Sequence, residues 1–314
     1  MKFALLFSGQ GAQKSGMGLD FLADPLFKET IETASQASGK DLIAIFKNEN
    51  GELNKTVNVQ PALVAYEAGI YRMLMRDLPN LPVAEMVGLS LGEYGAMFAS
   101  GALDLESTIK LVSDRARYMQ ADADKVENGM AALMRPDLTK VEATIDHLQE
   151  QGKRVYIANY NSPKQLVIAG VKQDVDQAAQ QLREDKACLK AISLKVNGAF
   201  HTPLFNGARA KMHDRLQKVV FKQNKVPVIS NTTAQPFTND WASIMEKQLA
   251  VPTHFGECLQ YLLDHEQVDT TLEIGPGHTL SSFAKQVDRK LTRYQIDDLA
   301  KYQQFIEAEN GFKK

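Results

Sequence analysis

The first 125 residues alternate short, partly apolar runs with longer segments that carry apolar side chains at helical spacing. The runs are FALLF at residues 3–7 and AEMV at residues 84–87, and both predict buried strands. Capping residues and helical spacing predict helices at residues 24–39, 58–77, 94–99 and 104–122. Because strands and helices alternate in this way, we predict an α/β fold with parallel crossovers.

The pattern changes between residues 126 and 196. Apolar runs predict four strands, at residues 130–134, 155–160, 165–170 and 191–196. Helical patterns follow the first and the third of these strands, at residues 138–151 and 175–185. This β-α-β-β-α-β order is ferredoxin-like. We therefore predict a small domain at residues 126–196, inserted into a larger α/β core formed by residues 1–125 and 197–314.

The remainder of the chain returns to the pattern of the first segment. It predicts strands at residues 226–230, 270–274 and 293–296, and helices at residues 203–219, 240–249, 253–266, near 280–283 and at 299–309. No internal repeat, low-complexity linker or coiled-coil heptad interrupts this pattern. The terminal helix and the short tail after it predict a free-standing protein.

Composition narrows the class of protein. The chain has 314 residues, a formal net charge of -2 and 44% hydrophobic residues, which allows a large core and offers no basic surface for nucleic acid or anionic membranes. The only cysteines are Cys188 and Cys258, so a disulfide framework is not expected and a reducing compartment is. The apolar run at residues 3–7 is too short for an export signal or a membrane span. We expect a cytoplasmic protein.

The segment Gly88-Leu89-Ser90-Leu91-Gly92-Glu93-Tyr94 lies between a predicted strand and a predicted helix. Strand, G-x-S-x-G and helix together predict a nucleophile elbow, in which Ser90 stands at the tip of a sharp turn. Free N–H groups at the start of the helix favour the negative charge that develops there. Short motifs recur by chance, so an ordinary glycine-rich turn is an equally good interpretation of this motif alone.

A second glycine-rich loop, Ser8-Gly9-Gln10-Gly11-Ala12-Gln13, follows the first strand. It lacks the Lys-Ser/Thr of a P-loop and the third glycine of a dinucleotide fingerprint, so nucleotide binding is weakly indicated. In elbow enzymes one oxyanion donor is the N–H after the nucleophile and the second comes from another loop. Our candidates are the N–H groups of Leu91 and Gln10. A plain tight turn explains the loop about as well.

Two polar residues fall where the pattern predicts buried surface. Arg115 shares a helix face with Val112 and Met119, where a charge needs a carboxylate partner or a cleft. Taken by itself, it is better explained by snorkelling or by pairing with a structural acid.

His201 precedes Thr202 and Pro203, which predict a helix start, and a helix N-terminus favours a neutral imidazole able to act as a base. A capping or packing role is the default for a lone histidine. The six histidines include no His-x-x-x-His pair, so no zinc site is expected.

Several motifs occur together in one order along nearly the whole chain, from Phe3 to about Leu280. They are Gly9-Gln10-Gly11-Ala12-Gln13, the segment from Gly88 to Tyr94, Arg115, Asn159-Tyr160-Asn161-Ser162-Pro163, Gly198-Ala199-Phe200-His201 and Glu273-Ile274-Gly275-Pro276-Gly277. In this order the chain resembles the malonyl-CoA:acyl carrier protein transacylases. The resemblance implies a hydrolase-like α/β core with a ferredoxin-like insert, in agreement with the order of elements above.

The resemblance also implies a reaction and a set of site residues. Ser90, activated by His201, attacks the malonyl thioester of malonyl-CoA, and the phosphopantetheine thiol of acyl carrier protein then takes the malonyl group, feeding fatty acid synthesis. Arg115 pairs with the free malonate carboxylate, and the N–H groups of Gln10 and Leu91 hold the oxyanion. The backbone carbonyl of Gln248 orients the histidine. Asn159, Asn161 and Phe200 line the cleft. No metal or cofactor is implied, and we expect a monomer.

Two departures from the family pattern stand out. Leu89 replaces the usual histidine before the nucleophile, and residues 250–254 (AVPTH) replace the usual Asn-Pro-Val-polar stretch, which places His254 as a candidate for the cleft entrance. Three alternatives stay open. A serine thioesterase shares the elbow but ends on water, a silent acyl-CoA or carrier-protein binding module needs no Ser90–His201 pair, and an acyltransferase unit can belong to a larger synthase.

Overall fold

A five-stranded parallel sheet forms the centre of the larger half of the computed structural model, which describes residues 1–196 and 198–311. Its strand order is β7-β2-β1-β8-β9, and every pairing in it is parallel. The strands are β1 (Phe3–Phe7), β2 (Val83–Gly88), β7 (Val228–Ile229), β8 (Thr270–Ile274) and β9 (Thr292–Ile296). The predicted parallel α/β fold is therefore confirmed.

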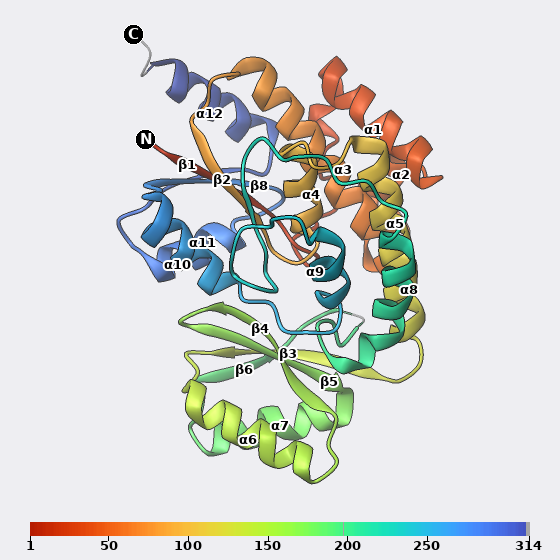
Figure 1. The fold of residues 1–314 in the computed structure, drawn as a ribbon, viewed down its shortest axis with the longest axis vertical. Helices are drawn as coiled ribbons and strands as arrows, with labels where there is room; N and C mark the ends of the chain where they lie inside the picture. The colour runs from red at the N-terminus through yellow and green to blue at the C-terminus, as the bar shows by residue number, and fades with distance from the viewer. Residues whose placement is uncertain (197, 312–314) are drawn as a thin grey trace.

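The sequence of strand β1 is a continuous apolar run because both faces of the strand are buried. Phe3, Leu5 and Phe7 pack into the main hydrophobic core, whereas Ala4 and Leu6 pack into a second core on the opposite face. Both faces of a parallel sheet are covered by helices, so every residue of the strand is buried. Helices α10 and α11 cover one face and α1 to α5 lie on the other side (Figure 1).

The helices of this half agree with the sequence pattern in most places. They are η1 (Asp20–Ala23), α1 (Pro25–Ser38), α2 (Leu42–Lys47), η2 (Glu52–Asn54), α3 (Thr56–Asp77), α4 (Gly92–Ala99), α5 (Leu105–Ala123), η3 (Pro203–Phe205), α8 (Asn206–Leu216), α9 (Trp241–Lys247), α10 (Phe255–Glu266), α11 (Thr279–Val287) and α12 (Leu299–Gly311). The prediction of one helix at 203–219 is wrong, because η3 and α8 divide it. Helix α2 was not predicted, since its six residues are too few to show a helical period.

A four-stranded antiparallel sheet lies below the parallel one in Figure 1. Its order is β4-β5-β3-β6, from β3 (Asn128–Met134), β4 (Val155–Ser162), β5 (Gln165–Val171) and β6 (Lys190–Ser193). Helices α6 (Leu138–Glu150) and α7 (Lys172–Glu184) complete the β-α-β-β-α-β order. Strand β6 ends three residues earlier than the predicted strand. The boundaries at 126 and 196 stay a prediction, and Asn197, which begins the second core segment, lies outside the described residues, as do residues 312–314 of the tail.

Residues of the antiparallel sheet alternate between two environments. Ala131, Leu133 and Ile168 pack against α6 and α7, whereas Ala132 and Val167 belong to the main core shared with the parallel half. Period-two alternation of this kind gives a sheet one face toward its own helices and one face toward a neighbour. The second face is therefore available to form a wall between the two sheets.

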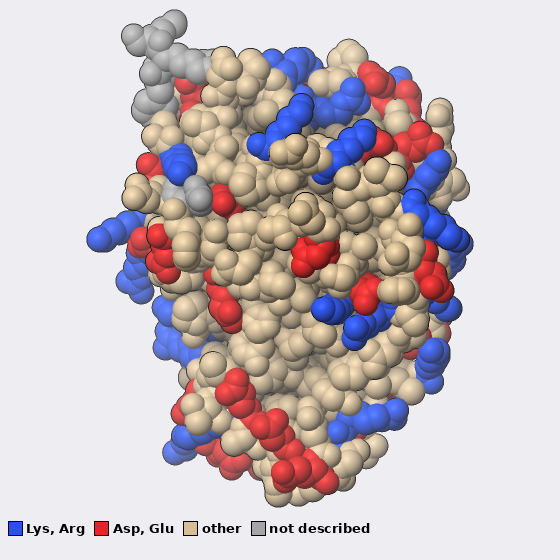
Figure 2. All heavy atoms as spheres, in the orientation of Figure 1, with Lys and Arg blue, Asp and Glu red and all other residues tan. Residues whose placement is uncertain are grey.

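The surface carries both signs of charge. Basic and acidic side chains are interspersed on the face seen in Figure 2, apart from an acidic row at its lower end, over α6. Exposed Glu142, Asp146 and Glu150 of α6 lie four residues apart and form such a row. Of the helices in the described part of the chain, none combines the length and the apolar character that crossing a membrane requires.

Candidate active site

The turn between β2 and α4 places Ser90 at the tip of a tight connection. Ser90 has φ +53, a left-handed conformation that is unfavourable for a residue with a Cβ atom. The glycines at either side are needed for close approach. A Cβ atom on Gly88 would lie 1.9 Å from the backbone of Gly92, and one on Gly92 would lie 2.1 Å from the carbonyl oxygen of Phe7. The turn therefore has the geometry of a nucleophile elbow.

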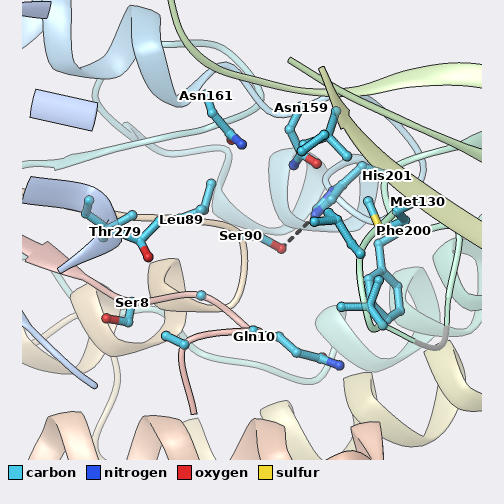
Figure 3. Close-up of a pocket in the computed structure, with 18 of the residues that line it drawn as sticks. Ser8, Gln10, Leu89, Ser90, Met130, Asn159, Asn161, Phe200, His201 and Thr279 are labelled. Atoms are coloured by element: carbon cyan, nitrogen blue, oxygen red, sulfur yellow. Dashed lines mark hydrogen bonds between the residues drawn. The ribbon is translucent and has the colours of Figure 1, made fainter. Parts of the chain in front are cut away.

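His201 faces Ser90 across the space between the two sheets (Figure 3). Its Nε2 atom lies 2.7 Å from Ser90 Oγ, and its Nδ1 atom lies 2.7 Å from the backbone carbonyl oxygen of Gln248. That carbonyl accepts the Nδ1 proton, so Nε2 is left to accept the proton of the serine. Ser90 and His201 are 111 residues apart in the chain, and His201 and Gln248 are 47 residues apart. The fold brings all three together.

Burial keeps the imidazole of His201 neutral. Burial and the nearby positive charge of Arg115 lower the pKa of His201 to about 4, although the hydrogen bond to Gln248 raises it. The predicted helix start is confirmed, since Thr202 is the N-cap of η3 and Pro203 is its first residue. The side chain of Thr202 makes no capping hydrogen bond, and its hydroxyl donates to the carbonyl oxygen of Ala199 at 2.7 Å. The neutral state was expected, but its cause is burial beside a cation rather than a helix N-terminus.

Arg115 projects from α5 to the elbow and is 1% exposed. Its Nη2 atom donates to Ser90 Oγ and to Gln248 Oε1, each at 3.1 Å, and its guanidinium lies 5.4 Å from the ring centre of Tyr94. Within residues 1–196 and 198–311 no carboxylate forms an ion pair with it, and its Nε has no hydrogen-bond partner. A buried guanidinium with a free donor is costly, so the site is suited to an anionic ligand.

Two backbone N–H groups beside Ser90 have no acceptor among the described residues. They belong to Gln10, in the loop after β1, and to Leu91, the residue after the nucleophile. The loop lies close to the elbow, since a Cβ atom on Gly9 would come 2.7 Å from the carbonyl oxygen of Leu89. Free N–H groups from two loops are the donors that an oxyanion requires.

A cavity of about 290 Å³ opens around Ser90 between the two sheets (Figure 3). Asn159, Asn161 and Phe200 line it, together with Gln10, Leu89, Ser90, Arg115, Met119, Met130 and His201. Gln248 and Leu91 are not among the lining residues, and the backbone carbonyl of Gln248 accepts from His201. His254, a candidate for the entrance, is not part of the lining. Its ring stacks on Tyr160 and its Nδ1 atom lies 2.8 Å from Glu257.

The side chains of Asn159 and Asn161 are held in place within this wall. Asn159 Nδ2 donates to Thr253 Oγ1 at 2.7 Å, and Asn161 Nδ2 donates to Gln165 Oε1 at 2.9 Å. Asn161 Oδ1 is buried and has no partner in the described part of the chain.

Asn231 and Glu93 are structural members of the site that the sequence analysis did not single out. Asn231 Oδ1 accepts the N–H of Ser90 at 2.7 Å, and Glu93 accepts from the backbone N–H of Asn231 and from the side-chain amide of Gln248. Both are fully buried. Burial raises the pKa of Glu93 to about 7, against the hydrogen bonds and the charge of Arg115. Glu93 lies within the segment Gly88 to Tyr94, which was the only available signal; no pattern pointed to Asn231.

No cluster of three or more His, Cys, Asp or Glu side chains suited to a metal ion occurs in the described ranges. Cys188 and Cys258 are both buried and unpaired. The chemical groups gathered at the cavity are therefore a serine, a neutral histidine, a guanidinium and two backbone donors. This set is suited to nucleophilic acyl transfer, in which a serine ester forms and an anionic group is held nearby.

The parallel sheet, the elbow and the paired histidine define a serine-dependent acyl-transfer enzyme on a hydrolase-like α/β core. The family can be stated more closely. Residues 4–299 match the model of the acyl transferase domain, and the chain belongs to this family.

Relatives and solved structures agree with this assignment. The malonyl CoA-acyl carrier protein transacylase of Bacillus subtilis is 35% identical over 302 residues, covering 95% of this chain and 94% of that protein. The MCAT structure from Streptococcus pneumoniae has a TM-score of 0.91 at 38% identity and covers 98% of this chain and all of that one. A malonyl-transacylase in complex with its type II PKS acyl-carrier protein has a TM-score of 0.93 at 30% identity, covering 98% of this chain and 100% of that one.

Proposed function

We propose that this enzyme transfers a malonyl group from malonyl-CoA to the phosphopantetheine thiol of an acyl carrier protein, in the service of fatty acid synthesis. The observation that carries the proposal is Arg115. A buried guanidinium with a free Nε atom, 3.1 Å from the nucleophile through Nη2, is suited to an acyl group that ends in a carboxylate. The names of the relatives support the same substrate and the same acceptor.

The first half-reaction forms an ester on Ser90. His201 Nε2 takes the hydroxyl proton while Ser90 Oγ bonds to the malonyl carbonyl carbon, supported by their 2.7 Å separation. The N–H groups of Gln10 and Leu91 stabilise the oxyanion. The carbon–sulfur bond then breaks, and His201 returns the proton to the departing CoA thiolate. Arg115 holds the malonate carboxylate throughout this half-reaction.

The second half-reaction reverses these roles. His201 takes the proton of the phosphopantetheine thiol, whose sulfur bonds to the ester carbonyl, and the bond to Ser90 breaks as its hydroxyl recovers the proton. The carbonyl of Gln248 keeps the same ring nitrogen available in both halves. Asn159, Asn161 and Phe200 form the walls along which the acyl chain and the carrier arm lie.

Three further proposals concern the setting of the enzyme. The domain boundaries are 1–125 and 197–314 for the core and 126–196 for the insert, supported by an antiparallel sheet whose strands all fall between residues 128 and 193. The compartment is the cytoplasm, supported by two cysteines that are buried and unpaired. The protein is a monomer, which light scattering during gel filtration tests directly.

The mass of the intact protein after mixing with malonyl-CoA tests the proposed reaction. We expect a malonyl adduct that persists in water and disappears when a phosphopantetheinylated acyl carrier protein is added, with the malonyl group appearing on the carrier. An adduct that hydrolyses at the same rate with or without the carrier indicates a thioesterase. No adduct from malonyl-CoA, but one from another acyl-CoA, overturns the substrate and keeps the mechanism.

A further inference from the structure

Ser90 and His201 both adopt conformations that they do not favour by themselves. Ser90 has φ +53 and His201 has φ +62, so both lie in the left-handed region. Such residues persist only where the surrounding structure holds them. The question is which side chains hold the two residues 2.7 Å apart, since the elbow follows β2 and His201 lies 111 positions later.

Asn231, just after β7, forms two hydrogen bonds to the backbone of the elbow. Its Oδ1 atom accepts the N–H of Ser90 at 2.7 Å, and its Nδ2 atom donates to the carbonyl oxygen of Gly88 at 2.8 Å. The two bonds connect backbone groups on either side of Leu89 and match the donor and acceptor of one amide. Because Asn231 occupies the N–H of Ser90, the N–H of Leu91 is the one left for the oxyanion.

Glu93, in the first turn of α4, connects Asn231 to His201 through Gln248. One carboxylate oxygen accepts the backbone N–H of Asn231, and the other accepts from Gln248 Nε2. Gln248 Nε2 also donates to the carbonyl oxygen of Ser90 at 3.0 Å, while its own backbone carbonyl accepts from His201. Glu93 is fully buried, so its two oxygens depend on these donors for their solvation.

We propose that Asn231 and Glu93 are positioning residues. They fix the strained elbow and hold Gln248, so that the nucleophile Ser90 and the base His201 keep a fixed position relative to each other. Neither touches the reacting atoms, and both act through their neighbours. The inference rests on the proposed acyl transfer by Ser90, but it concerns how the serine is made reactive rather than which acyl group it receives. It predicts slower attack by Ser90 with little change in substrate binding, since neither residue lines the cavity.

The reactivity of Ser90 toward an alkyl fluorophosphonate measures this directly. Asn231→Ala removes both bonds to the elbow and is expected to slow labelling about 10- to 100-fold, the effect of one or two lost hydrogen bonds. Asn231→Asp keeps the shape but replaces the donor that faces Gly88. Glu93→Gln keeps the shape but turns one acceptor into a donor that faces another donor. We expect both to slow labelling at least about five-fold.

Asn224→Ala is the matched control, because Asn224 also bonds a backbone carbonyl, that of Val226 at 2.9 Å, but lies away from the cavity. Its labelling rate is expected to stay within about two-fold of the unaltered protein. If Asn231→Ala does not fold, as judged by circular dichroism, the labelling rates of Asn231→Asp and Glu93→Gln test the proposal. Labelling within about two-fold of the unaltered protein in both of them overturns the proposal.

Single-turnover acylation by malonyl-CoA gives the second measurement. A positioning role lowers the saturating rate constant and leaves the half-saturating concentration within about two-fold of its original value. A general loosening of the fold raises the half-saturating concentration as well, and that result contradicts the proposal. If the unaltered protein reacts with the fluorophosphonate but not with malonyl-CoA, the proposed function fails, while the labelling rates still judge Asn231 and Glu93.

Discussion

The parallel sheet and the antiparallel sheet meet at the same cavity but contribute to it in different ways. The parallel sheet delivers backbone turns, since Gln10 follows β1 and Ser90 follows β2, at the carboxyl ends of adjacent strands. The antiparallel sheet delivers side chains from one face of its strands, among them Met130 and Asn161. The nucleophile and one oxyanion donor therefore sit on rigid turns of the buried sheet, whereas His201 follows β6 and Arg115 comes from α5. The antiparallel walls sit on a face where alternate positions can change independently.

This comparison predicts that changes at the ends of the parallel strands affect the rate of chemistry, whereas changes on the antiparallel face affect binding. Ser90→Ala is the most severe case. Without Oγ there is no atom to carry the acyl group, so we expect complete loss of the malonyl adduct by intact mass. The same variant should retain the melting temperature of the original protein within a few degrees. A covalent adduct on this variant would show that another residue is the nucleophile.

His201→Ala should slow acylation by about 10² to 10⁴, the contribution of a positioned base. The measurement is the single-turnover rate constant at saturating malonyl-CoA. His213→Ala provides the control, because His213 is exposed and bonds to Glu246 away from the cavity. Equal rates for the two variants would remove His201 from the mechanism.

Asn161→Ala tests the wall rather than the chemistry. Asn161 lines the cavity and its buried Oδ1 has no protein partner among the described residues, so we expect its removal to cost one neutral hydrogen bond to the substrate. We expect KM to rise about two- to ten-fold with kcat nearly unchanged. Asn239→Ala, at an exposed position before α9, is the matched substitution. A loss confined to kcat would place Asn161 with the reactive groups and break the distinction between the two sheets.

The smallest expected effect is an absence of titration. Because burial and Arg115 lower the pKa of His201 to about 4, the imidazole stays neutral as the pH falls from about 7.5 to about 5.5. A histidine with the ordinary pKa of 6.5 would be roughly nine-tenths protonated at the lower value. The ring carbon resonances of His201 in labelled protein, assigned through His201→Ala, should therefore not show the large shift of imidazole protonation over this range, and the titration of Glu93, whose pKa is about 7, should add only a small shift through Gln248. A full protonation shift with a midpoint near 6.5 would mean that the ring is not buried as described.

The sequence predicted the parts of the fold that depend on local pattern. Residues 3–7 form a strand because both faces of β1 are covered, and the order of elements between residues 128 and 193 follows from short strands and amphipathic helices. The face of Arg115 was also predictable, since Val112 and Met119 share its helical stripe and are buried. What α5 could not reveal is that no carboxylate in the described ranges forms an ion pair with Arg115, because that depends on other segments of the chain.

The parts that were missed depend on contacts between distant segments. The hydrogen bond between Asn231 and the N–H of Ser90 joins residues 141 positions apart, and no local motif distinguishes this asparagine from an ordinary loop residue. Thr202 does occupy the predicted N-cap position, but its hydroxyl makes a local bond to the carbonyl of Ala199 and accepts none from the following backbone N–H groups. The carbonyl of Gln248 was identified only through resemblance, since any residue supplies a carbonyl and its side chain gives no hint of that role.

The ratio of malonyl to acetyl transfer in Arg115→Ala tests the central claim most directly, namely that the buried guanidinium receives the substrate carboxylate. Single-turnover acylation from malonyl-CoA and from acetyl-CoA gives both rates on the same protein. We expect malonyl transfer to fall about 10²-fold more than acetyl transfer, as for the loss of a charge-assisted pair in a buried site. An equal fall for the two acyl groups would contradict the account and make Arg115 a structural residue that supports Ser90 and Gln248.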